Sequence, residues 1–294
     1  MVRSKWGILV ALALGLLVGY GAPAAGAAPM GKIPDGSVDP PGSNDWNCAP
    51  TAAHPEPVIL IHGTWDNQNA WDVLAPRVKA AGYCVFSLNY GRDTSSVLGA
   101  IPGQYATADI RVSARELAGF VDRVRAATGA RRVALVGHSQ GAVVARQYVR
   151  FEGGADEVGH LISLSGTNHG VSVSGLLAGR AETPQSPEWQ VAPLTGLAFV
   201  QQLAGSTLLR DLNADGDTVT GIAYTAIGSR VDDTSTPLEA TFLRAGPGAT
   251  VDNVIVQDVC PSDTYPHAML PQSSAVAYIV QRALDPTFEG TPCR

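Results

Sequence analysis

Six short apolar runs recur along the chain and predict β-strands. Each run is unbroken rather than alternating with polar residues, which is typical of strands buried on both faces of a parallel sheet. The predicted strands are Pro57–His62, Cys84–Tyr90, Arg132–Gly137, His160–Ser165, Gly221–Ile227 and Asn253–Gln257.

Helical patterns separate most of these strands. Ala70–Ala81 and Gln140–Glu152 each predict a helix, and a third helix is expected to end at Gly129, which suits a left-handed terminal position. The alternation of strand and helix predicts an α/β fold, with a mostly parallel central sheet of about six strands and helices on both faces. One face of the third helix carries apolar residues at helical spacing, namely Ile110, Ala114, Leu117, Val121 and Val124.

The first 27 residues have the pattern of a secretory signal peptide. Arg3 and Lys5 precede an apolar run, Gly7–Val18, and small residues follow it. The apolar run is shorter than the roughly 20 residues of a membrane-spanning helix, so we expect no stable membrane span. Cleavage after Ala27 would give a secreted, extracellular protein.

Composition and charge exclude further classes of protein. Of the 294 residues, 45% are hydrophobic and 16% are charged, which excludes disorder as the main state. The net charge of −6 and the absence of a basic run predict no nucleic-acid partner. Residues 28–56 read as an irregular lead-in to one domain over 57–294. Within that domain, Val171–Asn213 interrupts the alternation as a long, largely apolar insertion.

The pentapeptide Gly137-His138-Ser139-Gln140-Gly141 lies between a predicted strand and a predicted helix. This G-x-S-x-G pattern is typical of a nucleophile elbow, in which the serine occupies a strained turn at the edge of the sheet. The two glycines allow the strand and the helix to approach each other closely. The pattern therefore predicts Ser139 as a catalytic nucleophile.

A serine nucleophile needs a base, and in folds with this elbow the order along the chain is Ser, Asp or Glu, and then His. Of the six histidines, only His267 lies beyond the last predicted strand, so it is the predicted base. The acid would hold the imidazole tautomer and stabilise the imidazolium. Asp232 and Asp233 follow the fifth strand and Asp258 follows the sixth, and the residues alone leave these three candidates open.

Two backbone N–H groups are expected to form an oxyanion hole. One belongs to Gln140, directly after the serine. The other comes from the loop after the first strand, where Gly63 permits close approach and Thr64 could add its hydroxyl. His62 is expected to brace this loop.

Four cysteines allow three pairings. Cys48 and Cys84 are both expected at the N-terminal edge of the parallel sheet, whereas Cys260 follows the C-terminal end of the last strand. A Cys84–Cys260 bridge would have to cross a strand length of about 17 Å, and a disulfide needs Cα atoms within about 7 Å. The predicted bridges are therefore Cys48–Cys84 and Cys260–Cys293.

The segment from Asp211 to Asp217 has the acidic spacing of a calcium loop. The twelfth position is Ile222, which cannot supply the bidentate carboxylate of such a loop. We therefore expect a turn before the fifth strand, and no metal or cofactor.

From about Trp46 to the C-terminus, the sequence resembles the secreted class 2 triacylglycerol lipases of actinomycetes, which are related to the yeast lipase B type. The matching stretches are HPEPVILIHGTWDN, GYCVFSLNYG, VALVGHSQGAVVARQYV, LISLSGTNHG and YTAIGSRVDDTSTP. The resemblance implies an α/β-hydrolase fold and ester hydrolysis by a serine triad without metal. It agrees with the disulfide pairing above.

The resemblance also assigns roles to single residues. It implies Ser139 as nucleophile, His267 as base, and Thr64 and Gln140 as oxyanion donors. The acid of the family lies five residues before a proline, and Pro237 makes that residue Asp232. The sequence departs from the family pattern at Asn168-His169, where Pro-His is more usual, and in a longer loop at Leu212–Gly221.

These observations predict a secreted serine hydrolase of carboxylic esters, most simply a monomeric triacylglycerol lipase that meets its substrate at an oil–water interface. Esterase, phospholipase, polyester hydrolase, acyltransferase and a non-catalytic lipid-binding relative stay open. The insertion is expected to form an acyl-binding wall and a mobile cover over Ser139, with Leu176 and Leu177 contacting substrate. In the alternative, it is a core helix whose inward residues are Leu197, Val200, Leu203 and Leu208.

Overall fold

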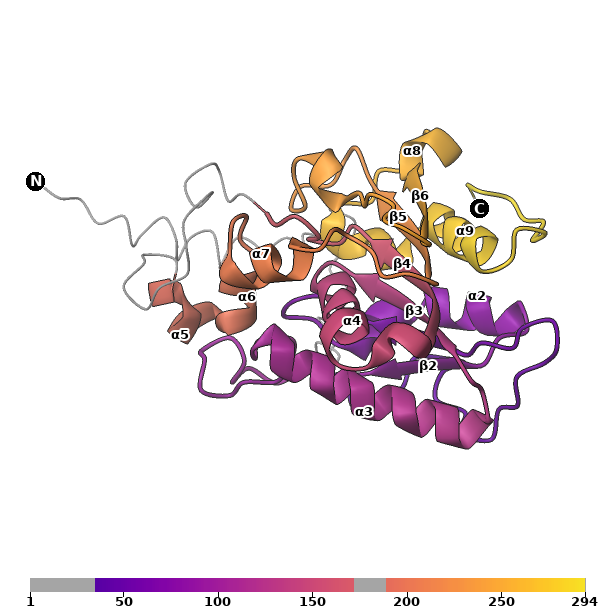
Figure 1. The fold of residues 1–294 in the computed structure, drawn as a ribbon, viewed down its shortest axis with the longest axis horizontal. Coiled ribbons are helices and arrows are strands. Elements are labelled where there is room, and N and C mark those ends of the chain that lie inside the picture. Colours follow the sequence, from indigo (N-terminus) through magenta and orange to yellow (C-terminus); the bar gives the residue numbers. More distant parts are fainter. Residues whose placement is uncertain (1–34, 172–188, 294) are drawn as a thin grey trace, which may run out of the picture.

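The computed structural model describes residues 35–171 and 189–293. Within these ranges six strands form a single parallel sheet, in the order β2-β1-β3-β4-β5-β6 (Figure 1). The predicted α/β class and the parallel sheet are confirmed. The strands are β1 (Val58–Ile61), β2 (Val85–Leu88), β3 (Val133–His138), β4 (Val158–Leu164), β5 (Ala223–Gly228) and β6 (Thr250–Ile255).

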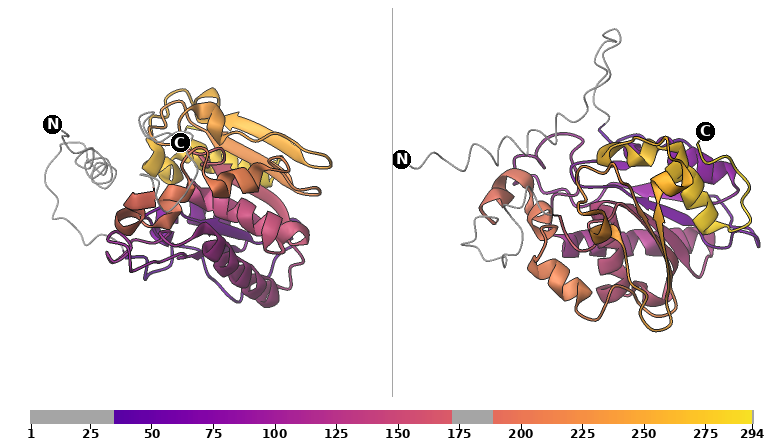
Figure 2. Two further views of the ribbon diagram at one scale, coloured as in Figure 1. Left: turned by 60° about the vertical axis from the view of Figure 1, so that its left-hand side comes forward. Right: turned by 90° about the horizontal axis from the view of Figure 1, so that it is seen from above.

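Helices cover both faces of the sheet (Figures 1 and 2). On one face, α3 (Ile110–Thr128) and α4 (Gln140–Phe151) pack against β1 through Ile59 and Ile61. On the other face, α2 (Leu74–Ala80) and α9 (Ser274–Leu284) form a second core cluster with Val58 and Leu60 of β1. The central strands are therefore buried on both sides, as their unbroken apolar runs predicted.

The helix α3 shows how local sequence sets an element. Asp109 caps its first turn by accepting a hydrogen bond from the backbone N–H of Arg111, and Gly129 ends it with φ of 70°. The five apolar residues predicted for its inner face are all fully buried.

Two predicted elements differ from the structure. The helix expected over residues 70–81 is split into a 3-10 helix, η1 (Gln68–Trp71), and α2. The strand expected at 253–257 is β6, which ends at Ile255, and Val256–Val259 forms α8. Ile255 pairs with Gly228, the last residue of β5. The residues after Ile255 therefore have no residue of β5 to pair with. Because β6 is an edge strand, it is partly exposed rather than buried on both faces.

The lead-in protects the opposite edge of the sheet. Asn44 binds β2 through its backbone N–H to the oxygen of Val85, and through its side chain to the N–H and oxygen of Ser87, at 2.9–3.0 Å. These bonds satisfy edge groups that would otherwise be free to pair with another chain. The Cys48–Cys84 disulfide joins the lead-in to the start of β2.

Both predicted disulfides are present, with Cα–Cα distances of 5.7 Å for Cys48–Cys84 and 5.5 Å for Cys260–Cys293. The second bridge holds the C-terminal tail against the end of α8. The pairing follows from the parallel direction of the strands. This direction places Cys84 at the N-terminal edge of the sheet and Cys260 beyond the C-terminal edge, too far apart to form a bridge.

The described part of the insertion, residues 189–213, is helical and packed. The leucines of α7 (Thr207–Asn213) belong to the same core cluster as α4. Val200 and Leu203 form a separate small cluster with Val171 and Val191. Val200, Leu203 and Leu208 are buried and Leu197 is half-buried, and these are the residues that the core-helix alternative placed inward. Leu176 and Leu177 lie outside the described residues. The elements are η3 (Trp189–Val191), α5 (Ala192–Thr195), α6 (Leu197–Gln201) and α7 (Thr207–Asn213).

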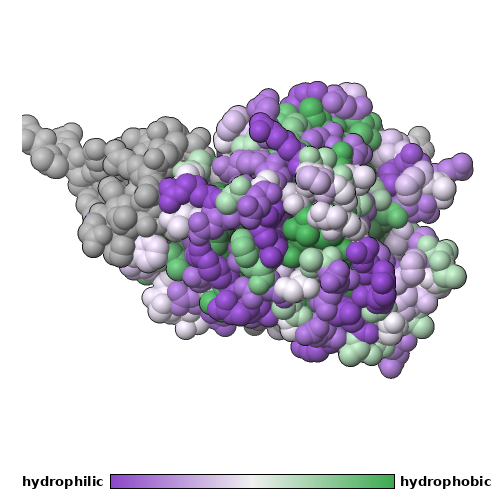
Figure 3. Space-filling model, viewed as in Figure 1, coloured by the Kyte–Doolittle hydropathy of each residue, from purple (hydrophilic) through white to green (hydrophobic). Residues whose placement is uncertain are grey.

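The face of the molecule shown in Figure 3 is mostly hydrophilic, with small separate apolar areas. Large hydrophobic side chains that are exposed come from different parts of the described chain, for example Val38, Phe151 and Val231. No helix within 35–171 or 189–293 is both long and apolar enough to cross a bilayer.

Candidate active site

Ser139 stands at a strained turn between β3 and α4. Its φ of 53° and ψ of −120° lie outside the regions that a non-glycine residue normally occupies. A Cβ on Gly137 would collide with the backbone of Gly141 and Ala142, and one on Gly141 would collide with the backbone oxygen of Ile61. The two glycines are therefore a steric requirement of the turn, which has the geometry of a nucleophile elbow.

The elbow lies at the point where the strand order reverses. The strands β1 and β3 are neighbours, but the chain leads from β1 to one side of the sheet and from β3 to the other. A crevice forms outside the carboxyl ends of two such strands, and ligands of open α/β sheets bind there. Ser139 follows β3 and Gly63 follows β1. A Cβ on Gly63 would lie 3.2 Å from the Cβ of Ser139, so these two loops are in close contact.

A histidine and a carboxylate meet beside this crevice. His267 begins the 3-10 helix η5 (His267–Gln272), and its Nδ1 lies 2.9 and 3.1 Å from the two carboxylate oxygens of Asp232. Only 8% of the His267 side chain and 1% of the Asp232 side chain are exposed. An ionised Asp232 holds the proton of the ring on Nδ1 and leaves Nε2 free to accept another.

The environment of Asp232 keeps it ionised. Burial by itself raises the pKa of Asp232, but hydrogen bonds and charge act in the opposite direction and lower the pKa to about 2. The hydrogen bond and charge of His267 contribute most of this lowering. The backbone N–H groups of Thr234 and Ser235, each 2.8 Å from Oδ1, contribute the rest.

The other two candidate acids have different partners. Asp233 accepts a hydrogen bond of 3.3 Å from the backbone N–H of His267, and not from its ring. Asp258 forms an exposed ion pair of 2.6 Å with Arg230. Of the three carboxylates, Asp232 is the one that the structure brings to the His267 ring.

Ser139 and His267 line the same pocket, together with Gly63 and Thr64 from the loop after β1. The neighbouring His138 connects the elbow to η5, since its Nε2 lies 3.0 Å from the backbone oxygen of His267. Burial, aided by the charge of His267, lowers the pKa of His138 to about 3, so its ring is neutral and Nε2–H is the donor. Other residues lining the pocket are Trp65, Asp66, Gln104, Thr167, Val171, Phe199, Gln202, Thr234 and Ala268.

The sequence matches the family model of lipase (class 2) over residues 55–269. The chain belongs to the class 2 lipase family. The name of the family denotes carboxylic ester hydrolases that act on lipids. No curated protein matches the sequence.

Solved lipase structures share the fold of this class 2 lipase. Lipase B of Aspergillus fumigatus has a TM-score of 0.61 and 18% identity, with 88% of this chain and 60% of that chain covered. The mature form of the Bacillus licheniformis lipase BlEst2 has a TM-score of 0.57 and 14% identity, with 80% and 94% covered. This chain thus spans about three fifths of the Aspergillus protein. The fold is the α/β-hydrolase fold.

In this class 2 lipase, Thr64 is held by two side-chain amides. Its Oγ1 accepts hydrogen bonds of 2.9 Å from Nε2 of Gln140 and from Nε2 of Gln202. A hydroxyl has two acceptor sites and one proton. Because both acceptor sites are used, the proton of Thr64 is left to be donated to a third group.

Gln202 is a site residue that sequence reasoning missed. It lies in the insertion, where its Oε1 accepts a hydrogen bond of 3.0 Å from Thr167 and its Nε2 also donates to the oxygen of Ala198. The only local signal is a polar pair, Gln201-Gln202, at the end of a largely apolar helix, and both of these side chains are buried. Such a pair indicates buried polar contacts but does not identify the partner.

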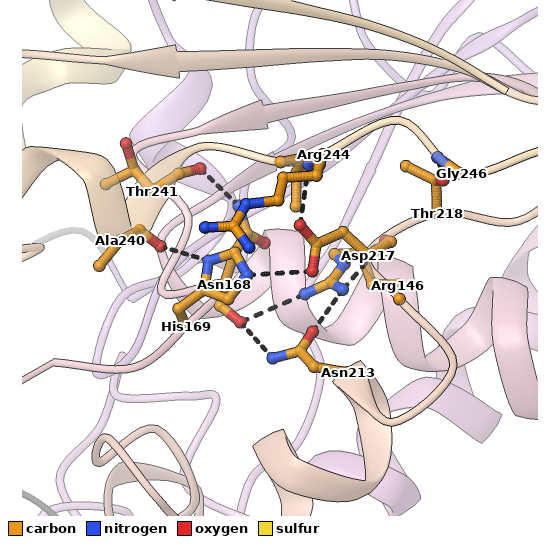
Figure 4. A network of polar contacts seen from close by, with 12 residues as sticks. Arg146, Asn168, His169, Asn213, Asp217, Thr218, Ala240, Thr241, Arg244 and Gly246 are labelled. Atoms are coloured by element: carbon orange, nitrogen blue, oxygen red, sulfur yellow. Dashed lines mark hydrogen bonds and ion pairs between the residues drawn. The ribbon is translucent and has the colours of Figure 1, made fainter.

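The segment with the acidic spacing of a calcium loop, for which the sequence predicts a turn, makes internal contacts (Figure 4). The guanidinium of Arg146, from α4, donates to the side-chain oxygen of Asn213 at 2.6 Å and to the backbone oxygen of Asp217 at 3.0 and 3.2 Å. Burial lowers the pKa of Arg146 to about 10, so it remains a cation at neutral pH. The structure thus supports the turn. The described residues contain no group of three or more His, Cys, Asp or Glu arranged for a metal ion.

The two departures from the family pattern contact each other in this network. The backbone oxygen of Asn168 accepts hydrogen bonds from Arg146 at 3.3 Å and from Asn213 at 3.0 Å. The ring of His169 lies 3.0 Å from the carboxylate of Asp217. Figure 4 shows these side chains pointing toward one another between the ends of the two loops. The longer loop therefore packs against the altered segment after β4.

His62 contacts the loop after β1, which it is expected to brace. Its Nδ1 is 2.9 Å from the backbone oxygen of Gly63, and its ring stacks on Tyr90 at 4.6 Å. The hydroxyl of Tyr90 donates to the backbone oxygen of His62 at 2.7 Å. Burial lowers the pKa of His62 to about 4, so the ring is neutral and acts as a support.

Proposed function

We propose that this protein hydrolyses carboxylic esters through an acyl-enzyme on Ser139, with His267 as general base and Asp232 as the orienting acid. The observation that carries the proposal is the bond between His267 Nδ1 and Asp232, next to a strained serine in the same pocket. These are the roles that a serine triad requires.

In this mechanism Nε2 of His267 removes the proton of Ser139 as Oγ attacks the ester carbonyl. The resulting oxyanion is bound by the backbone N–H groups of Thr64 and Gln140 and by the hydroxyl of Thr64. The N–H of Gln140 is available because it belongs to the first turn of α4, where no helical partner exists. His267 then protonates the leaving alcohol, and a water molecule releases the acid by the same steps.

The test is the variant Ser139→Ala, compared with Ser37→Ala, which changes an exposed serine outside the pocket. Ser139→Ala should fold normally and lose turnover by about six orders of magnitude, as in other triad enzymes. A fluorophosphonate should label the wild type and Ser37→Ala but not Ser139→Ala. Labelling or near wild-type hydrolysis by Ser139→Ala would refute the mechanism, and an unlabelled wild type would favour a non-catalytic lipid-binding protein.

For the substrate we propose triacylglycerols with medium or long acyl chains. The pocket contains apolar side chains, among them Val171 and the stacked pair Trp65 and Phe199, with ring centroids 5.2 Å apart. Each buried CH₂ group favours binding by about 0.8 kcal/mol. Hydrolysis of acetate, octanoate and oleate esters tests this, and a preference for acetate throughout would identify a small-ester esterase instead. Glycerophospholipids and polyesters assayed beside triolein distinguish the remaining alternatives.

We propose further that the protein is exported and processed after Ala27. The two disulfides support this, because such bridges form and persist in oxidising compartments. N-terminal sequencing of protein recovered from the medium should find Ala28 first. Retention of residues 1–27 in the recovered protein would contradict the proposal.

A further inference from the structure

A carboxylate that the proposed mechanism does not use lies in the pocket of Ser139. Asp66 and Gln104 both line this pocket. The backbone N–H of Trp65 donates to the oxygen of Tyr105 at 3.0 Å, and the N–H of Tyr105 donates to the oxygen of Asp66 at 3.1 Å. The side chain of Asn67 adds a bond of 3.0 Å to the oxygen of Gly103. These bonds hold the loop after β1 against residues 103–105, so the two polar side chains come from adjoining segments.

Asp66 lacks a countercharge. Its Oδ1 accepts a hydrogen bond of 2.8 Å from the backbone N–H of Asn67, and no cation of the described chain forms an ion pair with it. Burial raises the pKa of Asp66 to about 6, and the N–H of Asn67 offsets this only in part. At neutral pH the group is therefore mostly an unpaired, partly desolvated anion, which is an unfavourable state without a ligand.

The second polar group is also unsatisfied. The side-chain oxygen of Gln104 is buried and has no hydrogen-bond partner among residues 35–171 and 189–293. Buried polar groups are nearly always paired, and an unpaired one in a pocket beside a nucleophile points to a partner on the ligand. Neither Asp66 nor Gln104 contacts His267 or Thr64 through a hydrogen bond, so neither is needed to hold the proposed catalytic groups.

We propose that Asp66 and Gln104 form a subsite for a free hydroxyl group of the ester substrate, so that partial esters of polyols, including those that hydrolysis of a triacylglycerol releases, react faster than esters of the same acyl chain without a hydroxyl. A hydroxyl can donate its one proton to the carboxylate of Asp66 while its oxygen accepts a bond from Nε2 of Gln104, and a second hydroxyl of a polyol can donate to the unpaired Oε1 of Gln104. An ammonium group only donates, and one face of the Trp65 ring is already stacked against Phe199. An ammonium group therefore serves only the oxygens of the two residues, whereas the hydroxyls of a polyol match both the oxygen and the N–H groups of the Gln104 amide.

This inference rests on the proposed function and adds to it a selectivity for esters with a free hydroxyl over esters without one. An ester without a hydroxyl leaves both polar groups buried and unpaired when it fills the pocket. Sites built to bind a substrate hydroxyl discriminate strongly against the analogue that lacks it, for this reason. The preference should appear in kcat/KM, and Ser139 should remain the nucleophile for both kinds of ester.

The first experiment uses the wild-type protein and two pairs of matched esters at about pH 8. One pair is 2-hydroxyethyl octanoate and propyl octanoate, in which a methyl group replaces the hydroxyl of the alcohol. The other pair is methyl 3-hydroxyoctanoate and methyl octanoate, in which the acyl chain differs. We expect kcat/KM to favour the hydroxylated member of one pair by about tenfold or more, as for a hydrogen bond to a charged group. The pair that shows the preference identifies whether the hydroxyl belongs to the alcohol or to the acid.

The second experiment compares Asp66→Asn and Gln104→Leu with Asp72→Asn. Asp72 is an exposed carboxylate at the end of η1 that does not line the pocket. Each pocket variant should lower the preference at least about threefold, mainly by slowing the hydroxylated ester, because charge-assisted bonds are roughly twice as strong as neutral ones. Asp72→Asn should keep the wild-type ratio.

Equal kcat/KM values within both pairs in the wild type would overturn the subsite, as would an unchanged preference in both pocket variants. A larger preference for choline octanoate over 3,3-dimethylbutyl octanoate would identify a cation site in its place. These outcomes leave ester hydrolysis intact and so differ from failure of the proposed function. An enzyme inactive toward all of the esters would refute that function, and the subsite with it.

Discussion

The side-chain amide of Gln202 donates a hydrogen bond of 2.9 Å to the hydroxyl oxygen of Thr64, although the two residues are 138 positions apart. This bond joins the insertion after β4 to the loop after β1. Together with the bond from Gln140, it occupies both acceptor sites of the hydroxyl. The Thr64 proton is thereby directed away from both amides, and Gln202 acts as a positioning residue for a proposed oxyanion donor.

Removing this support should lower kcat more than it changes KM. Thr64→Val should reduce kcat by about 10²–10³, the usual cost of one oxyanion donor, whereas Thr64→Ser keeps the hydroxyl and most of the activity. Gln202→Leu should cost about tenfold, because the donor remains but is less well directed. Steady-state kinetics with a soluble ester checks this. A Gln202→Leu enzyme with wild-type kcat would show that the bond is only structural.

The three candidate acids should respond differently to neutralisation. Asp232→Asn should reduce kcat by about 10⁴, because the amide no longer holds the proton of His267 on Nδ1. Asp233→Asn and Asp258→Asn serve as matched controls and should change kcat by only a few fold, since neither carboxylate bonds to the ring. Loss of activity in Asp258→Asn with activity retained in Asp232→Asn would place the acid after β6 instead of β5.

Stability should fall between about pH 6.5 and pH 4. Burial lowers the pKa of His62 and His160 to about 4 and of His138 to about 3, whereas the unfolded chain binds these protons near pH 6.5. Three groups therefore favour unfolding as the pH falls. Asp66 acts in the opposite sense, because its raised pKa makes the folded state bind a proton first. At the steepest point the unfolded chain binds almost two protons more than the folded chain. The free energy of unfolding therefore decreases by about 3 kcal/mol for each pH unit by which the pH falls.

Urea unfolding at several pH values measures this slope. His160→Gln removes a half-buried imidazole that does not line the pocket of Ser139 and should flatten the curve, whereas Asp66→Asn should steepen it. A free energy of unfolding that is constant from pH 7 to pH 5 would contradict the assignment of neutral buried histidines.

The Arg146 network should matter for stability rather than for chemistry. Arg146→Met keeps much of the side-chain volume but leaves the side-chain oxygen of Asn213 and the backbone oxygen of Asp217 without their donor, whereas the oxygen of Asn168 keeps its bond from Asn213. Each buried acceptor that stays unpaired costs about 1–3 kcal/mol. Arg150→Met is a suitable control, because Arg150 contacts the same loop from a more exposed position. Thermal unfolding and kcat measured together test this, and an Arg146→Met enzyme as stable as wild type would refute it.

Much of the fold could be predicted because it depends on neighbours along the chain. Unbroken apolar runs indicated the buried strands, the helical spacing from Ile110 to Val124 indicated the inner face of α3, and the elbow pattern indicated the turn at Ser139. The same sequence misplaced the end of β6, because a strand continues only where a neighbouring strand pairs with it. That neighbour, β5, ends at Gly228. The disulfide pairing followed from the predicted strand direction alone.

The sequence by itself thus determined the strands, the elbow and the relative order of Ser139 and His267, because each depends on short-range pattern or on position along the chain. The residues alone left the acid open and the family spacing to Pro237 implied Asp232, but only the tertiary structure shows which carboxylate meets the His267 ring. Asp232 turns toward it because the N–H groups of Thr234 and Ser235 bind its Oδ1, while Asp233 turns to the backbone. The contact of Gln202 with Thr64 was likewise decided by the fold. It joins segments far apart in the sequence, and a hydrogen bond between such segments leaves no periodic signal in either one.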